Sequence, residues 1–130
     1  MEKKILKVAV NKNCQNKENP QLVATGWKNV YVDINWLLDW VNHGYGWCAT
    51  HFHERRRRAD NAAGSNMVVI DFDGDTTLEA FWDTQTAKDW CVATYTSSSH
   101  TPAEHRFRAL FPLEVELDHP AKHRGAYWLI

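Results

Sequence analysis

The stretch MVVIDFDGD, residues 67–75, decides the fold class of this chain. Four apolar residues, Met67 to Ile70, run without interruption into an acidic segment that contains Gly74. A short apolar run of this kind, with a glycine behind it, predicts a strand buried on both faces and followed by a turn. Because side chains two positions apart on a strand point the same way, we expect Asp71 and Asp73 on one face, about 6–7 Å apart.

Two interpretations of this acidic pair are open. Neighbouring carboxylates repel each other, and a divalent cation with a preference for oxygen ligands, Mg²⁺ or Mn²⁺, relieves that repulsion. Asp71 and Asp73 are then metal ligands. In the other interpretation, Asp-Gly-Asp is a polar turn at the end of a core strand, because a single D-x-D motif has low specificity.

Composition predicts one soluble domain over residues 1–130. Apolar residues make up 44% of the chain and charged residues 24%, which is typical of a globular protein. The net charge is −1, so the overall charge does not indicate a nucleic-acid partner. The three cysteines are widely spaced, which indicates reduced thiols and a cytoplasmic protein. No apolar run has transmembrane length, and we expect no membrane partner.

The segments before the central stretch alternate strands with a helix. We expect a strand at 3–10, a polar loop at 11–21, a strand at 29–32, a helix capped by Asp33 and stopped near Gly44, and a strand at 46–52. Residues 53–66 have loop composition and contain four consecutive arginines, Arg55, Arg56, Arg57 and Arg58. These arginines form either a solvated charge run or a loop that binds the phosphates of a nucleic acid. We favour the phosphate-binding loop because it leads directly into the acidic strand.

The segments after the central stretch give a similar alternation. We expect a short helix with capping-box spacing at Thr76 and Glu79, continued over 87–90, strands at 92–96 and 106–111, and a final helix capped by Asp118. In the strand at 106–111, alternation places Arg106 and Arg108 on one face and three apolar side chains on the other. An acidic pair, a Ser/His turn and two arginines in this order are the parts that phosphoryl transfer requires.

These motifs resemble those of the archaeo-eukaryotic primase superfamily, in its plasmid, phage and CRISPR-associated primase-polymerase branch. The run VVIDFD, residues 68–73, resembles the first motif of the family, and Ser98-Ser99-His100 resembles the second. The segment HRFRALFPL, residues 105–113, is similar to the strand that follows, and Arg58 to Asn61 match an R-x-x-N pattern. The resemblance implies an α/β (α+β) fold with an RRM-like, mostly antiparallel sheet behind an N-terminal α/β unit.

The resemblance also implies roles for individual residues. Asp71 and Asp73 would coordinate Mg²⁺ or Mn²⁺, and His100 with Ser98 would contact the phosphates of the incoming nucleotide. Arg106 and Arg108 would contact nucleotide or template phosphates. Template-dependent nucleotidyl transfer would follow, as in a DNA primase or polymerase, with nucleoside triphosphates and a DNA template as partners. The family's third carboxylate would lie beyond Ile130, so we expect a truncated catalytic domain of a larger replication protein.

Three alternatives remain open. DFDGDTT also resembles the first motif of haloacid-dehalogenase-like phosphatases, with Asp71 as nucleophile, Asp73 as acid/base and Thr96 or Ser97 in the second motif. A replication-initiator nuclease would use His51 and His53 for a metal and Tyr127 as nucleophile. A non-catalytic RRM-like module would bind nucleic acid by stacking and charge alone.

Overall fold

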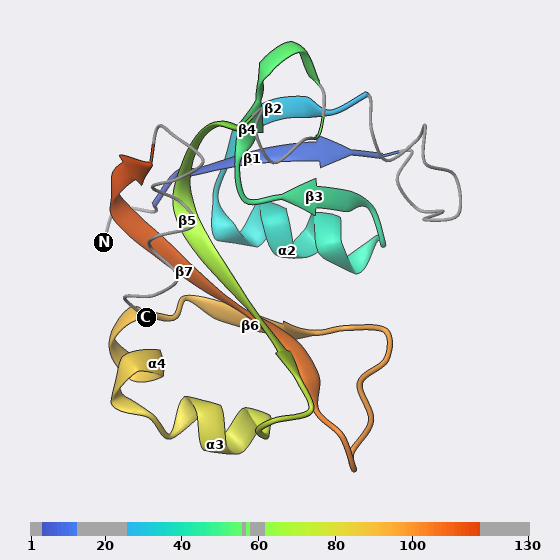
Figure 1. Ribbon diagram of the computed structural model, residues 1–130, viewed down its shortest axis with the longest axis vertical. Helices are drawn as coiled ribbons and strands as arrows, with labels where there is room; N and C mark the ends of the chain where they lie inside the picture. The colour runs from blue at the N-terminus through green and yellow to red at the C-terminus, as the bar shows by residue number, and fades with distance from the viewer. Residues whose placement is uncertain (1–3, 13–25, 56, 58–61, 118–130) are drawn as a thin grey trace.

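The computed structural model describes residues 4–12, 26–55, 57 and 62–117, which form two antiparallel sheets (Figure 1). In chain order the elements are β1 (Leu6–Asn11), β2 (Lys28–Val32), α2 (Ile34–Asn42), β3 (Gly46–Cys48), β4 (His51–Phe52), η1 (His53–Arg55), β5 (Ala62–Asp73), α3 (Leu78–Trp82), α4 (Gln85–Trp90), β6 (Ala93–Thr96) and β7 (Arg106–Leu117). The first sheet has the order β2-β1-β3 and the second the order β4-β5-β7-β6. The expected mixed α/β fold with mostly antiparallel sheets is confirmed.

Helix α2 forms where its capping residue and apolar spacing predict it. The Asp33 side chain accepts a hydrogen bond from the Trp36 N–H at 2.9 Å, which satisfies a free donor of the first turn. Gly44, with φ of +79°, follows the C-cap. Leu37 is fully buried and joins Val8 of β1 in the core of the N-terminal unit. The capped helix is therefore confirmed, as are the expected strands at 3–10 and 29–32.

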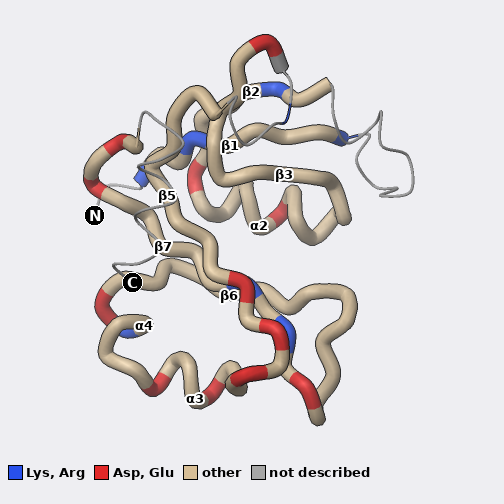
Figure 2. Tube along the Cα trace, in the orientation of Figure 1, with Lys and Arg blue, Asp and Glu red and all other residues tan. Residues whose placement is uncertain are grey.

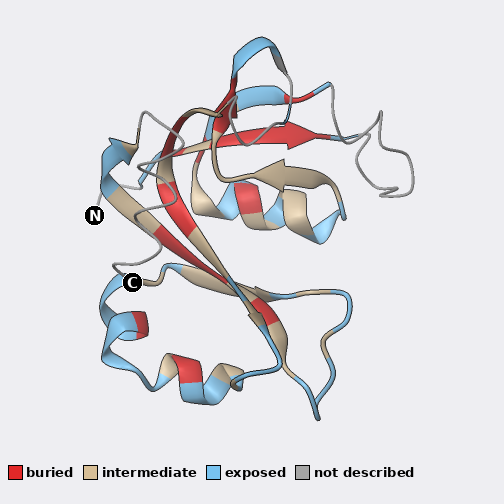
Figure 3. Cartoon of the chain, in the orientation of Figure 1, coloured by how far each residue is buried: buried red, intermediate tan, exposed pale blue. Residues whose placement is uncertain are grey.

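The long strands β5 and β7 carry apolar side chains on both faces, and their middle portions are buried (Figure 3). On one face, Met67 and Leu110 pack into the core with β1 and α2. On the other face, Val68 and Phe107 pack into a second core with Phe81 of α3. The expected strand with two buried faces is confirmed, and the strand pair belongs to both cores.

One expected strand, residues 46–52, is divided between the two sheets. β3 pairs with β1, whereas β4 pairs with β5. At the crossing the Thr50 hydroxyl donates to the Gly64 carbonyl at 2.9 Å, and the Ser65 hydroxyl donates to the Ala49 carbonyl. These two side chains satisfy carbonyls at the point where the chain leaves one sheet for the other.

The expected loop over residues 53–66 was too long, because β5 begins at Ala62. The small and polar residues that suggested a loop are paired with β4 and the far end of β7. Gly64 has φ of +153°, which residues with a side chain rarely adopt, and a Cβ would lie 2.6 Å from Glu116 Oε1 and 2.9 Å from Lys7 Nζ. These two side chains form an ion pair over the glycine. The absent side chain therefore reflects close packing in a strand.

The capping residue of α3 is Thr77 and not Thr76, since the Thr77 hydroxyl accepts the Ala80 N–H at 3.1 Å. The expected continuation is a separate helix, α4, capped by Thr84. The proposed final helix from Asp118, and Tyr127 with it, lie outside the described residues. Among the helices that the structure describes, none has the length and apolar character needed to cross a membrane.

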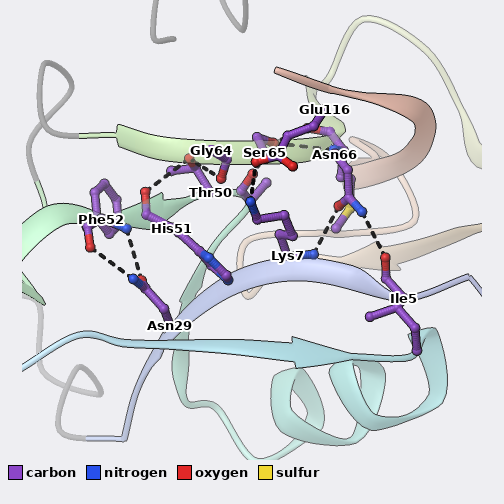
Figure 4. Close-up of polar contacts among 12 residues, drawn as sticks. Ile5, Lys7, Asn29, Thr50, His51, Phe52, Gly64, Ser65, Asn66 and Glu116 are labelled. Atoms are coloured by element: carbon purple, nitrogen blue, oxygen red, sulfur yellow. Dashed lines mark hydrogen bonds and ion pairs between the residues drawn. The ribbon is translucent and has the colours of Figure 1, made fainter. Parts of the chain in front are cut away.

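A group of polar side chains joins the N-terminal sheet to β4 and β5 (Figure 4). The Asn66 amide of β5 accepts the Lys7 N–H at 2.9 Å and donates to the Ile5 carbonyl at 2.8 Å. The Asn29 amide makes the same two kinds of bond with the backbone of Phe52, both at 2.9 Å. Each side-chain amide thus supplies the donor and the acceptor that a neighbouring strand would otherwise provide to the backbone.

His51 is buried in this joint, 6% exposed, and its Nε2 lies 2.9 Å from the Val30 carbonyl. Burial lowers the pKa of His51 and outweighs the hydrogen bond to Val30, which acts in the opposite direction. Below pH about 6.5, the ordinary histidine value, the unfolded chain therefore binds a proton that folded His51 does not.

We therefore expect the free energy of unfolding to decrease as pH falls below about 6.5, and this dependence to weaken in His51→Gln. Glutamine keeps a donor for Val30 and has no titration in this range. Urea unfolding of both proteins between pH 5 and 8 measures the difference. Equal pH dependence in the two proteins would contradict the assignment.

Candidate functional site

Two acidic residues of β5 lie opposite two arginines of β7. In the strand register Asp71 pairs with Arg108, and Asp73 pairs with Arg106. Residues directly opposite one another in an antiparallel pair project from the same face, so four charged side chains share one surface. Figure 2 shows acidic and basic segments side by side where β5 ends and β7 begins. The expectation that the two acids of D-x-D share one face of their strand, and the two arginines of R-x-R one face of theirs, is confirmed.

The side chains of this face already form ion pairs. Arg106 Nη1 donates to Asp73 Oδ1 at 2.6 Å, and Arg108 Nε lies 3.8 Å from Asp71 Oδ1. The Asp71 and Asp73 side chains are 65% and 70% exposed. Exposed ion pairs contribute only about 0–1 kcal/mol each. A phosphate group or a metal ion can therefore replace these contacts at small cost.

Glu104 is a third carboxylate at this end of the sheet, and it was absent from the sequence-based predictions. Its Oε1 accepts from Arg106 Nη2 at 3.0 Å, so one guanidinium joins Asp73 and Glu104. Gly74 makes room for it, since a Cβ there would lie 2.7 Å from Glu104 Oε1. Glu104 reaches this position through a tight turn with Thr101, which leaves no periodic signal in the sequence.

Tyr95 of β6 orients Arg108 from the other side and was also missed. Its hydroxyl oxygen accepts from Arg108 Nη1 at 3.1 Å and from Trp47 Nε1 at 3.0 Å. Burial lowers the pKa of Arg108, but the Tyr95 hydroxyl and the Asp71 carboxylate act in the opposite direction and the net shift is upward. Arg108 is therefore a fixed cation whose direction is set by a tyrosine.

His100 lies at the end of the same strand pair. Its Nδ1 accepts the backbone N–H of Arg106 at 3.1 Å, so the proton of the neutral ring is on Nε2. The ring packs against His105, with centroids 4.7 Å apart, and His105 Nδ1 in turn accepts the Leu78 N–H of α3 at 3.0 Å. Ser98 is exposed in the same loop. The structure thus brings His100 to the backbone of Arg106, the residue that pairs with Asp73.

Within the arginine run, the structure describes the side chain of Arg57. Arg57 precedes the first residue of β5, and Asp73 is the last residue of that strand. Arg57 contacts the N-terminal unit, where its Nε donates to Cys48 Sγ at 3.2 Å and its guanidinium lies over the Trp27 ring. The side chains of Arg55, Arg56 and Arg58 lie outside the described part. The expected connection of this loop to the acidic strand is present, and β5 begins earlier than its apolar core, at Ala62.

The structure also places the residues that the nuclease and phosphatase alternatives would use. His51, one half of the proposed nuclease metal site, is buried against the Val30 carbonyl, and His53 is exposed in η1. For the phosphatase alternative, Thr96 pairs with Phe107 in the register and not with an arginine. The Ser97 hydroxyl donates to the Arg106 carbonyl at 3.3 Å.

In the described ranges, no three His, Cys, Asp or Glu side chains form a group that could hold a metal ion by themselves. No protein-family model matches the chain, and the curated proteins and solved structures compared with it give no match either. The chemistry of the site therefore has to be argued from its own side chains.

Proposed function

We propose that this chain is the catalytic part of a primase-polymerase, which performs template-dependent nucleotidyl transfer on the face shared by β5 and β7. The observation that carries the proposal is the register that sets Asp71 against Arg108 and Asp73 against Arg106. Transfer of a nucleotidyl group requires cations to stabilise the negative charge of the phosphates, and carboxylates to hold the metal that bridges them. This register supplies both on one exposed surface.

The connection of the strands supports an RRM-like core. β5 leads through α3 and α4 to β6, and a hairpin returns the chain as β7 between them. This β-α-β-β order is the first part of a split β-α-β arrangement. The two helices pack on the face opposite the charged side chains, because Phe81 and Ala87 belong to the core of Phe107.

The donor set fits a divalent cation of the Mg²⁺ or Mn²⁺ type. Such ions are usually bound through one or two carboxylates and complete their shell with substrate phosphates and water. Asp71 and Asp73 would supply the carboxylates. When bound, the ion would neutralise charge on the phosphates and polarise them. Arg106 and Arg108 would bind and orient the phosphate oxygens through their fixed donors.

His100 would contribute a hydrogen bond from Nε2, because its Nδ1 is occupied by the Arg106 N–H. By the family resemblance, Ser98 would contact the same phosphates and DNA would be the template. The arginines of residues 55–58 would bind nucleic-acid phosphates through their forked donors. By the same resemblance, a third carboxylate ligand would complete the site. We propose that the whole protein acts in plasmid, phage or CRISPR-linked DNA replication.

A second candidate is a phosphate-binding module without catalysis. The observation that favours it is that both Asp71 and Asp73 are already paired with arginines. Arg106 also pairs with Glu104. In this case the carboxylates only hold the arginines in place, and the binding of phosphates does not depend on metal.

Calorimetry with a nucleoside triphosphate and Mn²⁺ distinguishes these two functions. We expect metal-dependent binding by the wild-type chain and its loss in the double variant Asp71→Ala/Asp73→Ala. His100→Ala is expected to weaken binding by about tenfold, as for the loss of one hydrogen bond to a charged group. The double variant Asp83→Ala/Asp89→Ala is the matched control, because it removes two exposed acids next to and within α4.

Binding that persists in Asp71→Ala/Asp73→Ala without metal would support the non-catalytic module. Absence of any binding by the wild type, in this chain and in one extended beyond residue 130, would overturn the primase-polymerase proposal.

A further inference from the structure

A pocket of about 560 Å³ lies between α2 and β6. Four residues of α2 and two of β6 line it: Leu38, Asp39, Val41, Asn42, Tyr95 and Thr96. Its volume is within the range of small-molecule sites, about 300–1,000 Å³. The walls come from the two different units of the fold, so the pocket exists only when α2 and the second sheet are both in place.

The pocket adjoins the charged face through Tyr95. Tyr95 lines the pocket, and its hydroxyl accepts a hydrogen bond from Arg108 at 3.1 Å. Arg108 in turn lies opposite Asp71 on β5. A ligand with its phosphates on the arginines therefore has its remaining part next to the wall formed by Tyr95.

The lining of the pocket suits the uncharged part of such a ligand. The Asp39 side chain is 75% exposed, and a carboxylate would repel phosphate while accepting hydrogen bonds from hydroxyl groups. Asn42 can both donate and accept, and the aliphatic side chains of Leu38 and Val41 offer apolar contact. Next to the pocket, His43 Nδ1 lies 3.8 Å from Asp39 Oδ2.

We propose that this pocket holds the nucleoside half of the nucleotide and that Asp39 and Asn42 bind the hydroxyl groups of its ribose. The proposal rests on the proposed function, since it places the phosphates on Arg106 and Arg108. In a nucleotide the sugar lies between the phosphates and the base, so the sugar is the part closest to the arginines. The chain would therefore select ribonucleotides over nucleotides that lack sugar hydroxyls.

Calorimetry in Mn²⁺ with three ligands tests this inference. The ligands are a ribonucleoside triphosphate, its 2′,3′-dideoxy form and inorganic tripolyphosphate. We expect the wild type to bind the ribonucleotide about tenfold or more tightly than the dideoxy form, as for hydrogen bonds to a charged group. Asp39→Ala and Asn42→Ala should reduce this preference and leave the binding of tripolyphosphate unchanged.

Two matched variants serve as controls. Asn35→Ala removes an exposed amide of the same helix that does not line the pocket, and Asp89→Ala removes an exposed acid of α4. Both should keep the wild-type preference.

The outcomes separate the two proposals. Equal affinity for the ribonucleotide and the dideoxy form, with tripolyphosphate still bound, would overturn the ribose pocket and leave the phosphate face in place. Failure of the wild type to bind any of the three ligands would overturn the phosphate face, and the pocket proposal with it.

Discussion

Replacing Phe107 with alanine is expected to lower the free energy of unfolding by about 3–5 kcal/mol. Phe107 is fully buried on β7 and stacks on Phe72 with ring centroids 4.8 Å apart. It also meets Phe81 of α3 edge to face at 5.6 Å. The substitution leaves a cavity between the sheet and the helices. Phe107 stands between Arg106 and Arg108 in the sequence, but its side chain is on the opposite face of the strand. Urea unfolding followed by far-UV circular dichroism measures the loss.

Val115→Ala provides the matched control. Val115 lies on the same strand but is 67% exposed, so its truncation should change the free energy of unfolding by less than about 0.5 kcal/mol. If Phe107→Ala does not fold at all, Phe107→Leu is the milder variant, expected to cost less because most of the volume remains. A loss below about 1 kcal/mol in Phe107→Ala would contradict the central position of this ring.

Arg106→Ala is expected to weaken triphosphate binding and to strengthen the binding of Mn²⁺ alone. The guanidinium of Arg106 holds Asp73 at 2.6 Å and Glu104 at 3.0 Å. Its loss removes charged hydrogen bonds to phosphate, worth about 1.5–3 kcal/mol or about 10–150-fold in affinity. It also frees two carboxylates for a cation, so the two affinities should change in opposite directions. Calorimetry with each ligand separately measures both.

Lys88→Ala is the matched control, because Lys88 is an exposed cation of α4, which packs on the opposite face of the sheet through Ala87. It removes one positive charge and should leave both affinities within about twofold. If Arg106→Ala binds triphosphate as well as the wild type, Arg106 acts only as a cross-strand partner of Asp73. The proposed phosphate face would then be wrong at this position.

Several elements could be predicted because their signals involve residues that are close in the sequence. The helix after Asp33 has its cap, its apolar spacing and its terminal Gly44 within 12 residues. The strand from Met67 has an apolar run that excludes a surface strand, and alternation around Arg106 assigns its two faces. Such local patterns are readable in the sequence because side-chain direction repeats every 3.6 residues in a helix and every 2 residues in a strand.

Element boundaries could not be predicted where tertiary contacts override composition. The run Ala62 to Asn66 has the composition of a loop, yet it extends β5 because it pairs with β4 and with the far end of β7. The change of sheet after Cys48 depends on hydroxyls that bond to carbonyls elsewhere, such as Thr50 to Gly64.

The candidate site divides in the same way. By itself, the sequence determined that Asp71 and Asp73 share a face and that Arg106 and Arg108 share another, because alternation is a property of one strand. Tertiary structure decided that these two faces are the same surface, since the register joins residues more than 30 positions apart. It also brought Tyr95, Glu104 and the α2 pocket to that surface. No local pattern specifies such contacts, because they depend on how the strands pair and how the helix packs over them.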